Sequence, residues 1–247
     1  MFVDQMIENA THRLNGRKIK DVRAGLGYTC VTLADNSCGL AYTFRNELGP
    51  CCGTLDEAGT LIGKSGEQII SFAKSNNLLE AAIGLATINA VFNITNINWE
   101  AGNIVHVLGI DDSVTFGMVG DFHPILSEIK KKTKNIYVFE KNVPEGSSLY
   151  REDDIPKYLP QCNVIVITAT SIINHTLDQI LQHCQNARQV CIVGPSTPLC
   201  PELFKDSPVT TLAGSVVTNP DLAMQIISQG GGTMSLKPAI QHVMVKV

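Results

Sequence analysis

Residues 113–140 read SVTFGMVGDFHPILSEIKKKTKNIYVFE, and this stretch decides the fold. Two short apolar runs, 114–119 and 136–140, have the length of buried strands. Between them, residues 125–132 carry apolar positions at the spacing of a helix. Parallel neighbouring strands need a crossover connection, which is usually a helix. The stretch therefore predicts a strand–helix–strand unit with parallel strands.

The same alternation continues to the end of the chain. Continuous apolar strands that alternate with helices are typical of a parallel sheet covered on both faces. We therefore predict a Rossmann-like, doubly wound α/β fold for this part. Its further expected strands are 164–168, 190–193, 209–212 and 242–245, and its further expected helices are 154–159, 176–184, 202–205 and 221–228.

The first part of the chain has a different organisation. We predict a helix over 3–14, strands over 20–34 and 38–44 joined by a turn at 35–37, a loop over 45–65, and helices from 65 to 74 and from 78 to 92. Ser65 and Gln68 have the spacing of a capping box, which places the start of the first of these two helices. Residues 94–112 mix Asn, Gly and Asp with short apolar pieces and are expected to link two domains, 1–98 and 99–247.

Composition narrows the class of protein. The chain has 247 residues, 44% hydrophobic and 17% charged, with a net charge of −4, so a packed core is expected and a general nucleic-acid binder is not. No apolar run is long enough to cross a membrane, and the N-terminus lacks the order of a signal peptide. We therefore expect a cytoplasmic protein whose eight cysteines are reduced, including the adjacent Cys51 and Cys52 in the predicted loop.

Polar and small residues follow four of the predicted strands. In an open parallel sheet, ligands bind beyond the carboxyl ends of the strands, near the point where the strand order reverses. We expect backbone N–H groups to be exposed there and to suit an anion, a carboxylate or a phosphate. The ligand-binding candidates are Gly120, Asp121, Phe122, Glu140, Thr168, Thr170, Ser171, Asn174, Gly194, Pro195, Ser196 and Thr197.

Gly117 and Gly120 resemble a degraded dinucleotide-binding loop. Glu140 follows about 20 residues later, where an acid that binds a ribose would stand. The full G-x-G-x-x-G pattern is absent, and His123-Pro124 replaces the flexible turn. An ordinary strand–helix turn with a surface glutamate is the alternative interpretation.

Metal and catalytic motifs are few. The sequence has no C-x-x-C, no H-E-x-x-H and no G-x-S-x-G. His123 is the metal-ligand candidate because it follows a strand end, where an imidazole can act as a ligand or a base. Its alternative role is to begin a helix.

The apolar helix predicted at 78–92 contains two polar residues of interest, Glu80 and Asn89. A polar Asn in such a helix needs a hydrogen-bond partner. Asn89 either forms a structural hydrogen bond or, together with Glu80, faces the binding cleft.

Several blocks resemble one known family. The helix Glu80-Ala-Ala-Ile-Gly-Leu-Ala-Thr-Ile-Asn-Ala90, the segments 119–124 and 167–171, and the pair 186–188 and 193–199 are similar, in this order, to the putative heavy-metal chelation family. The resemblance covers nearly the whole chain. It implies a domain similar to the enolase N-terminal fold, a Rossmann-like domain after it, and a site in the cleft between them.

Three functions follow as hypotheses. The first is a binding or chelation protein whose cleft holds a transition-metal ion or a metal-bearing small molecule. The second is an enzyme with a nucleotide-type cofactor, NAD or S-adenosylmethionine, with Gly120 near the phosphates or sulfonium and Glu140 on the ribose. The third is an assembly component whose cleft is buried in a homodimer. Whether the chain catalyses a reaction is left open by the sequence.

Overall fold

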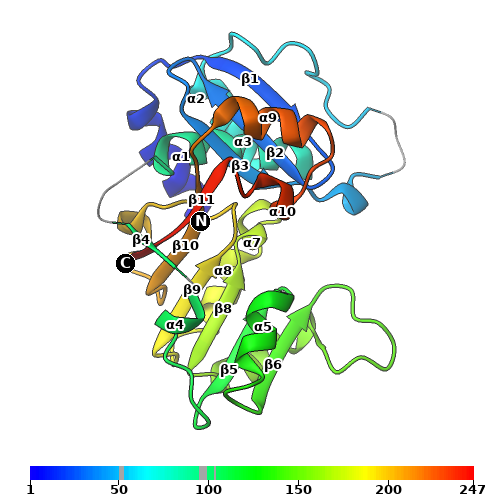
Figure 1. The fold of residues 1–247 in the computed structure, drawn as a ribbon, viewed down its shortest axis with the longest axis vertical. Helices are drawn as coiled ribbons and strands as arrows, with labels where there is room; N and C mark the ends of the chain where they lie inside the picture. Colours follow the sequence, from blue (N-terminus) through cyan, green and yellow to red (C-terminus); the bar gives the residue numbers. More distant parts are fainter. Residues whose placement is uncertain (50–52, 95–98, 103) are drawn as a thin grey trace.

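A computed structural model describes residues 1–49, 53–94, 99–102 and 104–247. It contains two sheets, a three-stranded antiparallel sheet in the upper part of Figure 1 and an eight-stranded sheet in the lower part. This mixed α/β architecture confirms the predicted fold class. The Cys51-Cys52 pair lies outside the described residues. None of the described helices combines the length and apolarity needed to cross a bilayer.

The three-stranded sheet and its helices come first in the chain. The sheet has the order β1-β2-β3, with antiparallel pairs throughout. The elements are α1 (Phe2–Leu14), β1 (Ile19–Ala24), β2 (Tyr28–Leu33), β3 (Cys38–Tyr42), η1 (Arg45–Glu47), α2 (Gly66–Ile70), η2 (Ser71–Lys74) and α3 (Leu78–Phe92).

The eight-stranded sheet has the order β4-β11-β10-β9-β8-β5-β6-β7. Strands β7, β6, β5, β8, β9 and β10 run parallel to one another, whereas β11 is antiparallel to both β10 and β4. The strands are β4 (Glu100–Ala101), β5 (Thr115–Val119), β6 (Asn135–Glu140), β7 (Tyr150–Arg151), β8 (Val164–Thr168), β9 (Gln189–Val193), β10 (Thr211–Val217) and β11 (Ile240–Lys246).

Helices cover both faces of this sheet. Phe116 and Met118 of β5 pack with α5 on one face, and Ile165 and Ile167 of β8 pack with α8 on the other, so the sheet is doubly wound. The helices are α4 (Ile104–Val107), α5 (His123–Ile129), η3 (Glu152–Asp154), α6 (Ile155–Tyr158), η4 (Leu159–Gln161), α7 (Thr170–Ile173), α8 (Leu177–Gln182), η5 (Pro201–Phe204), α9 (Pro220–Ser228) and α10 (Thr233–Leu236).

Two sequence-based expectations were wrong in detail. Residues 20–34 form two strands, because Gly25 donates its N–H to the Tyr28 carbonyl (2.9 Å) and closes a tight turn. A Cβ on Gly25 would lie 2.4 Å from the Ile227 carbonyl oxygen, so this turn packs directly on α9. The last strand runs antiparallel, because β11 returns beside β10 through α9 and α10 without a full crossover.

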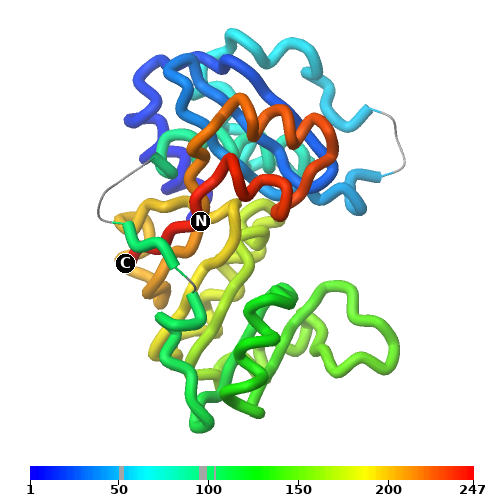
Figure 2. The backbone as a smooth tube through the Cα atoms, viewed as in Figure 1, coloured from blue at the N-terminus to red at the C-terminus, as the bar shows by residue number. Residues whose placement is uncertain are grey.

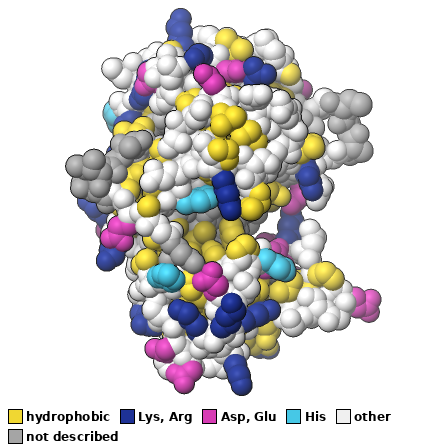
Figure 3. Space-filling model, in the orientation of Figure 1, with side chains coloured by type: hydrophobic (Ala, Val, Ile, Leu, Met, Phe, Trp, Pro, Cys, Tyr) yellow, Lys and Arg dark blue, Asp and Glu magenta, His cyan; other side chains and the backbone are white. Residues whose placement is uncertain are grey.

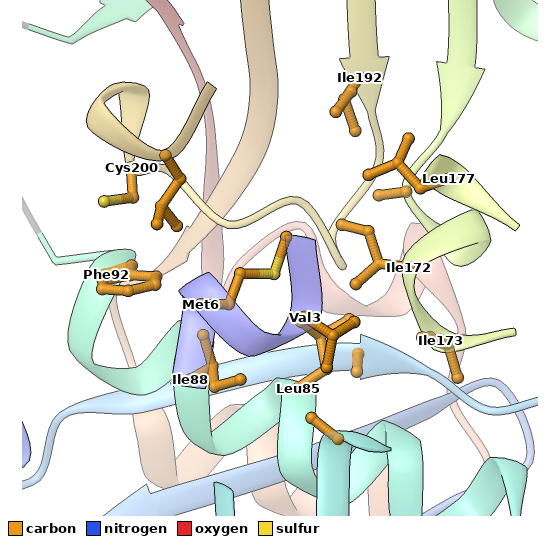
Figure 4. Close-up of a cluster of buried hydrophobic side chains, with 14 of the residues drawn as sticks. Val3, Met6, Leu85, Ile88, Phe92, Ile172, Ile173, Leu177, Ile192 and Cys200 are labelled. Atoms are coloured by element: carbon orange, nitrogen blue, oxygen red, sulfur yellow. The ribbon is translucent and has the colours of Figure 1, made fainter. Parts of the chain in front are cut away.

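One apolar core joins the two sheets. Helix α3 is buried along almost its whole length, as expected from its composition. Figure 4 shows Val3 and Met6 of α1 and Leu85 and Ile88 of α3 in one cluster with side chains of α7 and β9, and Phe92 of α3 near Cys200. The two parts of the chain therefore pack through a continuous interior. The predicted division at residue 98 stays a prediction.

The other face of the small sheet is covered by the end of the chain. Helices α9 and α10 contribute Ala223, Ile227 and Leu236 to a cluster with Cys30 and Leu40. In Figure 2 the orange and red segment lies across the blue strands. Strand β2 is buried at every position because α3 lies on one of its faces and α9 on the other.

Candidate functional site

A cavity of ≈ 340 Å³ lies at the carboxyl ends of the parallel strands. The strand order reverses between β5 and β8, which is where the fold class places its ligands. We call this cavity the strand-end cleft. In Figure 3 the molecule is notched on the right between its upper and lower parts, with charged side chains at the edge of the notch. The small sheet closes the cleft from above through Tyr28, Tyr42, Phe44 and Glu47.

Most of the candidate residues line this cleft together. The four loops after β5, β6, β8 and β9 converge on it. The lining candidates are Gly120, Asp121, Phe122, Glu140, Thr168, Thr170, Ser171, Asn174, Gly194, Pro195 and Ser196.

Gly120 is required by the geometry of the first loop. Its φ is +88°, a left-handed conformation that favours glycine. A Cβ at this position would also lie 2.7 Å from Cγ2 of Thr168. The backbone of the loop after β5 therefore lies so close to the Thr168 side chain, at the end of β8, that no side chain fits at position 120.

Five backbone N–H groups of these loops differ from expectation, because they already have partners. Gly120 donates to the Phe139 carbonyl (2.9 Å), Ala169 to Val193 (2.9 Å) and Gly194 to Ala213 (3.0 Å). Thr170 donates to Oγ1 of Thr168 at 3.3 Å. The N–H of Asp121 is bonded to the Glu140 carboxylate. These five groups are therefore not open to an anion.

Carboxylates dominate the charge of the cleft. Asp121, Glu47, Glu140 and Glu152 line it, and the cationic side chain among the lining residues is Lys141. Lys141 forms an ion pair with Glu47, which joins the loop after β6 to η1 of the first part. The carboxylates therefore outnumber the positive charge that faces them.

Glu152 is the carboxylate most affected by its surroundings. Partial burial raises its pKa above the ordinary value of 4.5, Lys141 opposes this rise, and Glu140, Glu47 and Asp153 add to it. No described residue forms a hydrogen bond or an ion pair with its carboxylate, although Lys141 is near enough to stabilise the charge.

Asp121 has one paired and one unpaired oxygen. Its Oδ2 lies 2.9 Å from Nδ1 of His123, and its side chain is 18% exposed. Its Oδ1 is shielded from solvent and has no hydrogen-bond partner among the described residues. A buried acceptor without a donor is costly, so this oxygen is an unfavourable element of the loop after β5.

Aromatic rings form the opposite wall. The rings of Tyr28 and Tyr42 meet edge to face with centroids 6.1 Å apart, and those of Tyr42 and Phe44 do so at 5.2 Å. The Tyr28 hydroxyl is 2.7 Å from Oγ1 of Thr233, which orders it. Burial raises the pKa of Tyr28, so its hydroxyl stays protonated at neutral pH.

Four candidates lie elsewhere. His123 is 87% exposed on the outer side of Asp121 and does not line the cleft. Glu80 accepts a hydrogen bond from Oγ of Ser75 (2.5 Å) near the start of α3. Thr197 is fully buried, and its hydroxyl donates to the Ala213 carbonyl at 3.0 Å. Asn89 is also fully buried.

Asn89 supports the floor of the cleft from behind. Its Nδ2 donates to the carbonyls of Leu40 (2.8 Å) and Ser196 (3.0 Å). One turn later, Asn93 donates to the carbonyls of Thr197 (2.9 Å) and Ser215 (3.2 Å) and accepts the N–H of Leu199 (2.8 Å). Helix α3 thus fixes the loop after β9. For Asn89, this is the structural hydrogen-bonding role, one of the two roles that the sequence left open.

Sequence reasoning missed the residues that the first part contributes. Tyr42 ends β3, and Phe44 and Glu47 follow it. No spacing in the sequence relates these residues to strand ends a hundred residues away. Glu152 follows β7, a strand of two residues that is too short to give a periodic signal. A strand beside β6 is nevertheless required by the order of a doubly wound sheet, so a search between 141 and 160 could have found it.

The described part of the chain offers no group of three side chains that would hold a bare metal ion. Among the described residues, no three His, Cys, Asp or Glu side chains are placed to hold one ion. The carboxylates of the cleft are near enough to influence one another but do not converge on one point. The six described cysteines are all buried.

Comparison with known proteins places this geometry among relatives. Two family models match, over residues 7–92 and 103–246, and both carry the description "Putative heavy-metal chelation". An uncharacterized protein of Methanocaldococcus jannaschii is 29% identical over 260 residues, covering 100% of this chain and 98% of its own length.

Two crystal structures of proteins with unknown function have the same fold. The protein from Pyrococcus horikoshii has a TM-score of 0.87 and 26% identity, and coverage is 100% of both chains. The protein from Desulfitobacterium hafniense has a TM-score of 0.80 and 24% identity, also with 100% coverage of both chains.

Proposed function

Because this chain belongs to the family described as "Putative heavy-metal chelation", we propose that it binds a small organic molecule able to carry a metal ion, and does so in the strand-end cleft. The observation that carries the proposal is the cleft itself, where four strand-end loops meet the wall formed by Tyr42 and Phe44. Its volume of ≈ 340 Å³ falls at the lower end of the range of small-molecule sites, about 300–1,000 Å³.

A molecule that brings the metal fits this cleft better than an ion alone. The carboxylates are too dispersed to complete a coordination shell, as the absence of a three-ligand group among the described residues indicates. A chelator supplies its own ligands, so the protein needs only to recognise the outside of the complex. Hydroxyl groups of Thr168, Thr170 and Ser196 and the aromatic wall suit such contacts.

A nucleotide-type cofactor is the alternative, and the loop after β5 favours it less. The N–H of Asp121 is bonded to Glu140, and Pro124 at the start of α5 has no N–H. A pyrophosphate would therefore find few donors where a dinucleotide fold supplies them. In addition, one Glu140 oxygen is already engaged, which weakens its proposed role on a ribose.

The test is to identify what the purified protein carries. We expect mass spectrometry of the extracted ligand fraction to find a small organic molecule, and elemental analysis to find a metal in matching stoichiometry. Asn142→Trp should abolish both, because this exposed loop residue lines the cleft and the new ring fills its mouth. Ser148→Trp is the matched control, since Ser148 lies in the same loop but does not line the cleft.

Two results would count against the proposal. One is a metal that stays bound to Asn142→Trp at the wild-type ratio, which would place the ion elsewhere. The other is an extracted molecule that Asn142→Trp and Ser148→Trp lose equally, because the loss would then come from the loop and not from a filled cleft.

A further inference from the structure

The charge balance of the strand-end cleft identifies a class of ligand, and this step rests on the proposed function. Acceptors and donors are not equally available in the cleft. The N–H groups of Gly120, Ala169 and Gly194 are bonded to carbonyls of neighbouring strands. The positive side chain, Lys141, is bonded to Glu47. These four groups, which could recognise an anion, thus already have partners.

Groups that could recognise a cation do not all have partners. Glu152 has no hydrogen bond or ion pair with a described residue, and Asp121 adds a negative charge to the lining of the same cavity. Glu140 bonds the Asp121 N–H through one oxygen, Oε1. Glu152 and Glu140 therefore have unused acceptor capacity in one cavity, and Asp121 adds negative charge to it.

The aromatic wall adds a second, independent preference. Cations bind over the faces of aromatic rings, with a gain of about 0.5–2 kcal/mol depending on desolvation. Tyr42 meets Phe44 edge to face, so the two ring planes are almost perpendicular, at 88°. Both residues line the cleft from the small sheet, whereas Asp121, Glu140 and Glu152 line it from the ends of β5, β6 and β7. A positive group in the cleft would thus have aromatic rings on one side and acceptors on the other.

We propose that the strand-end cleft selects organic cations or positively charged metal complexes, through Glu152, Glu140 and Asp121 on one side and Tyr42 and Phe44 on the other. A small metal ion without its own ligands is excluded from this class by the dispersed carboxylates. Free phosphates and anionic chelates are disfavoured by the four carboxylates that line the cleft against one lysine.

Ionisation of Glu152 should be linked to binding. The groups that face its carboxylate are Lys141, which favours the ionised form, and Glu140, Glu47 and Asp153, which oppose it. A bound cation adds to the effect of Lys141. Binding should therefore lower the pKa of Glu152, release a proton near that pKa, and become tighter as the pH rises through it.

The experiment uses probes that differ in charge and little in shape. Choline is compared with 3,3-dimethyl-1-butanol, its neutral carbon analogue, and hexaamminecobalt(III) with hexacyanocobaltate(III). Amide chemical shifts of the full chain report where each probe binds, with Gly120 and Gly194 as reporters of the cleft. We expect the two cations to shift these amides and the neutral and anionic partners to leave them unchanged.

Two variants separate the cleft from general surface charge. Glu152→Gln should weaken hexaamminecobalt(III) binding by about tenfold, because it removes a partly desolvated charge next to the ligand. Asp153→Asn removes the same charge at an exposed neighbour that does not line the cleft, and should change the affinity by less than about twofold. Calorimetry in buffers of different ionisation enthalpy should detect the released proton in the wild type and lose it in Glu152→Gln.

The outcomes distinguish the two proposals. If the neutral or anionic probes bind in the cleft as well as the cations, or if Glu152→Gln and Asp153→Asn have equal effects, the cation preference is wrong while the cleft stays a binding site. If none of the four probes shifts the reporter amides, the cation preference is refuted. If the extracted ligand also remains on Asn142→Trp, the proposed function is refuted with it.

Discussion

Replacing Asn93 by Ala tests whether α3 holds the loop after β9 in place. Asn93 is 3% exposed and forms three hydrogen bonds, to the carbonyls of Thr197 and Ser215 and from the N–H of Leu199. At about 0.5–1.5 kcal/mol for each bond, their loss should lower the free energy of unfolding by about 3 kcal/mol. For a chain of this size, that change corresponds to a melting temperature lower by about 6–12 °C.

The assay is thermal unfolding followed by circular dichroism, with hydrogen exchange of the Leu199 amide as a local readout. Asn9→Ala is the control, because Asn9 lies on the exposed side of α1 and bonds only the Gln5 carbonyl there. We expect the control to change stability by less than about 0.5 kcal/mol. A loss below about 1 kcal/mol in Asn93→Ala, or a Leu199 amide that keeps its protection, would refute the role assigned to Asn93.

Further predictions concern packing, pH and the exposed histidine. Gly84→Ala should destabilise the protein by about 1–3 kcal/mol despite the better helix propensity of Ala, because the new Cβ would lie 2.1 Å from the Ala73 nitrogen; an unchanged melting temperature contradicts this. Glu152→Gln should raise the melting temperature at pH 7 and leave it unchanged near pH 3. The raised pKa of Glu152 means that its ionised form opposes folding above that pKa, whereas below the ordinary value of 4.5 the carboxyl is neutral in both states; the reverse pH pattern would be inconsistent with this. His123→Ala should leave both the melting temperature and the metal content unchanged, because its side chain is 87% exposed outside the cleft; a lost metal in elemental analysis would restore His123 as a ligand.

The large sheet was predictable because its signals are local. Apolar runs of strand length alternate with helical segments from residue 113 onward, and the helix Leu78–Phe92 was expected with the same bounds that the structure gives it. The capping box at Ser65 and Gln68 is also present as expected. Each of these signals lies within a few residues along the chain.

The small sheet and half of the cleft were less predictable because they depend on distant contacts. The turn at Gly25 packs on α9, which lies two hundred residues later in the chain, and the sequence around Gly25 does not specify this contact. Tyr42 enters the cleft because its N–H donates to Oγ of Ser196 at 2.8 Å, a contact across 154 positions. The occupied N–H groups at the strand ends likewise follow from neighbours in the sheet, which a single sequence does not specify.

The position of α9 and α10 over the small sheet has a consequence for synthesis. Residues 1–92 emerge from the ribosome with the outer face of β2 and β3 uncovered, and residues 220–240 complete that face only after about 130 further residues. At typical translation rates this delay is roughly 6–25 s. Cys30 and Leu40 stay uncovered for that time, and a ribosome stalled before residue 220 would present this apolar face to solvent.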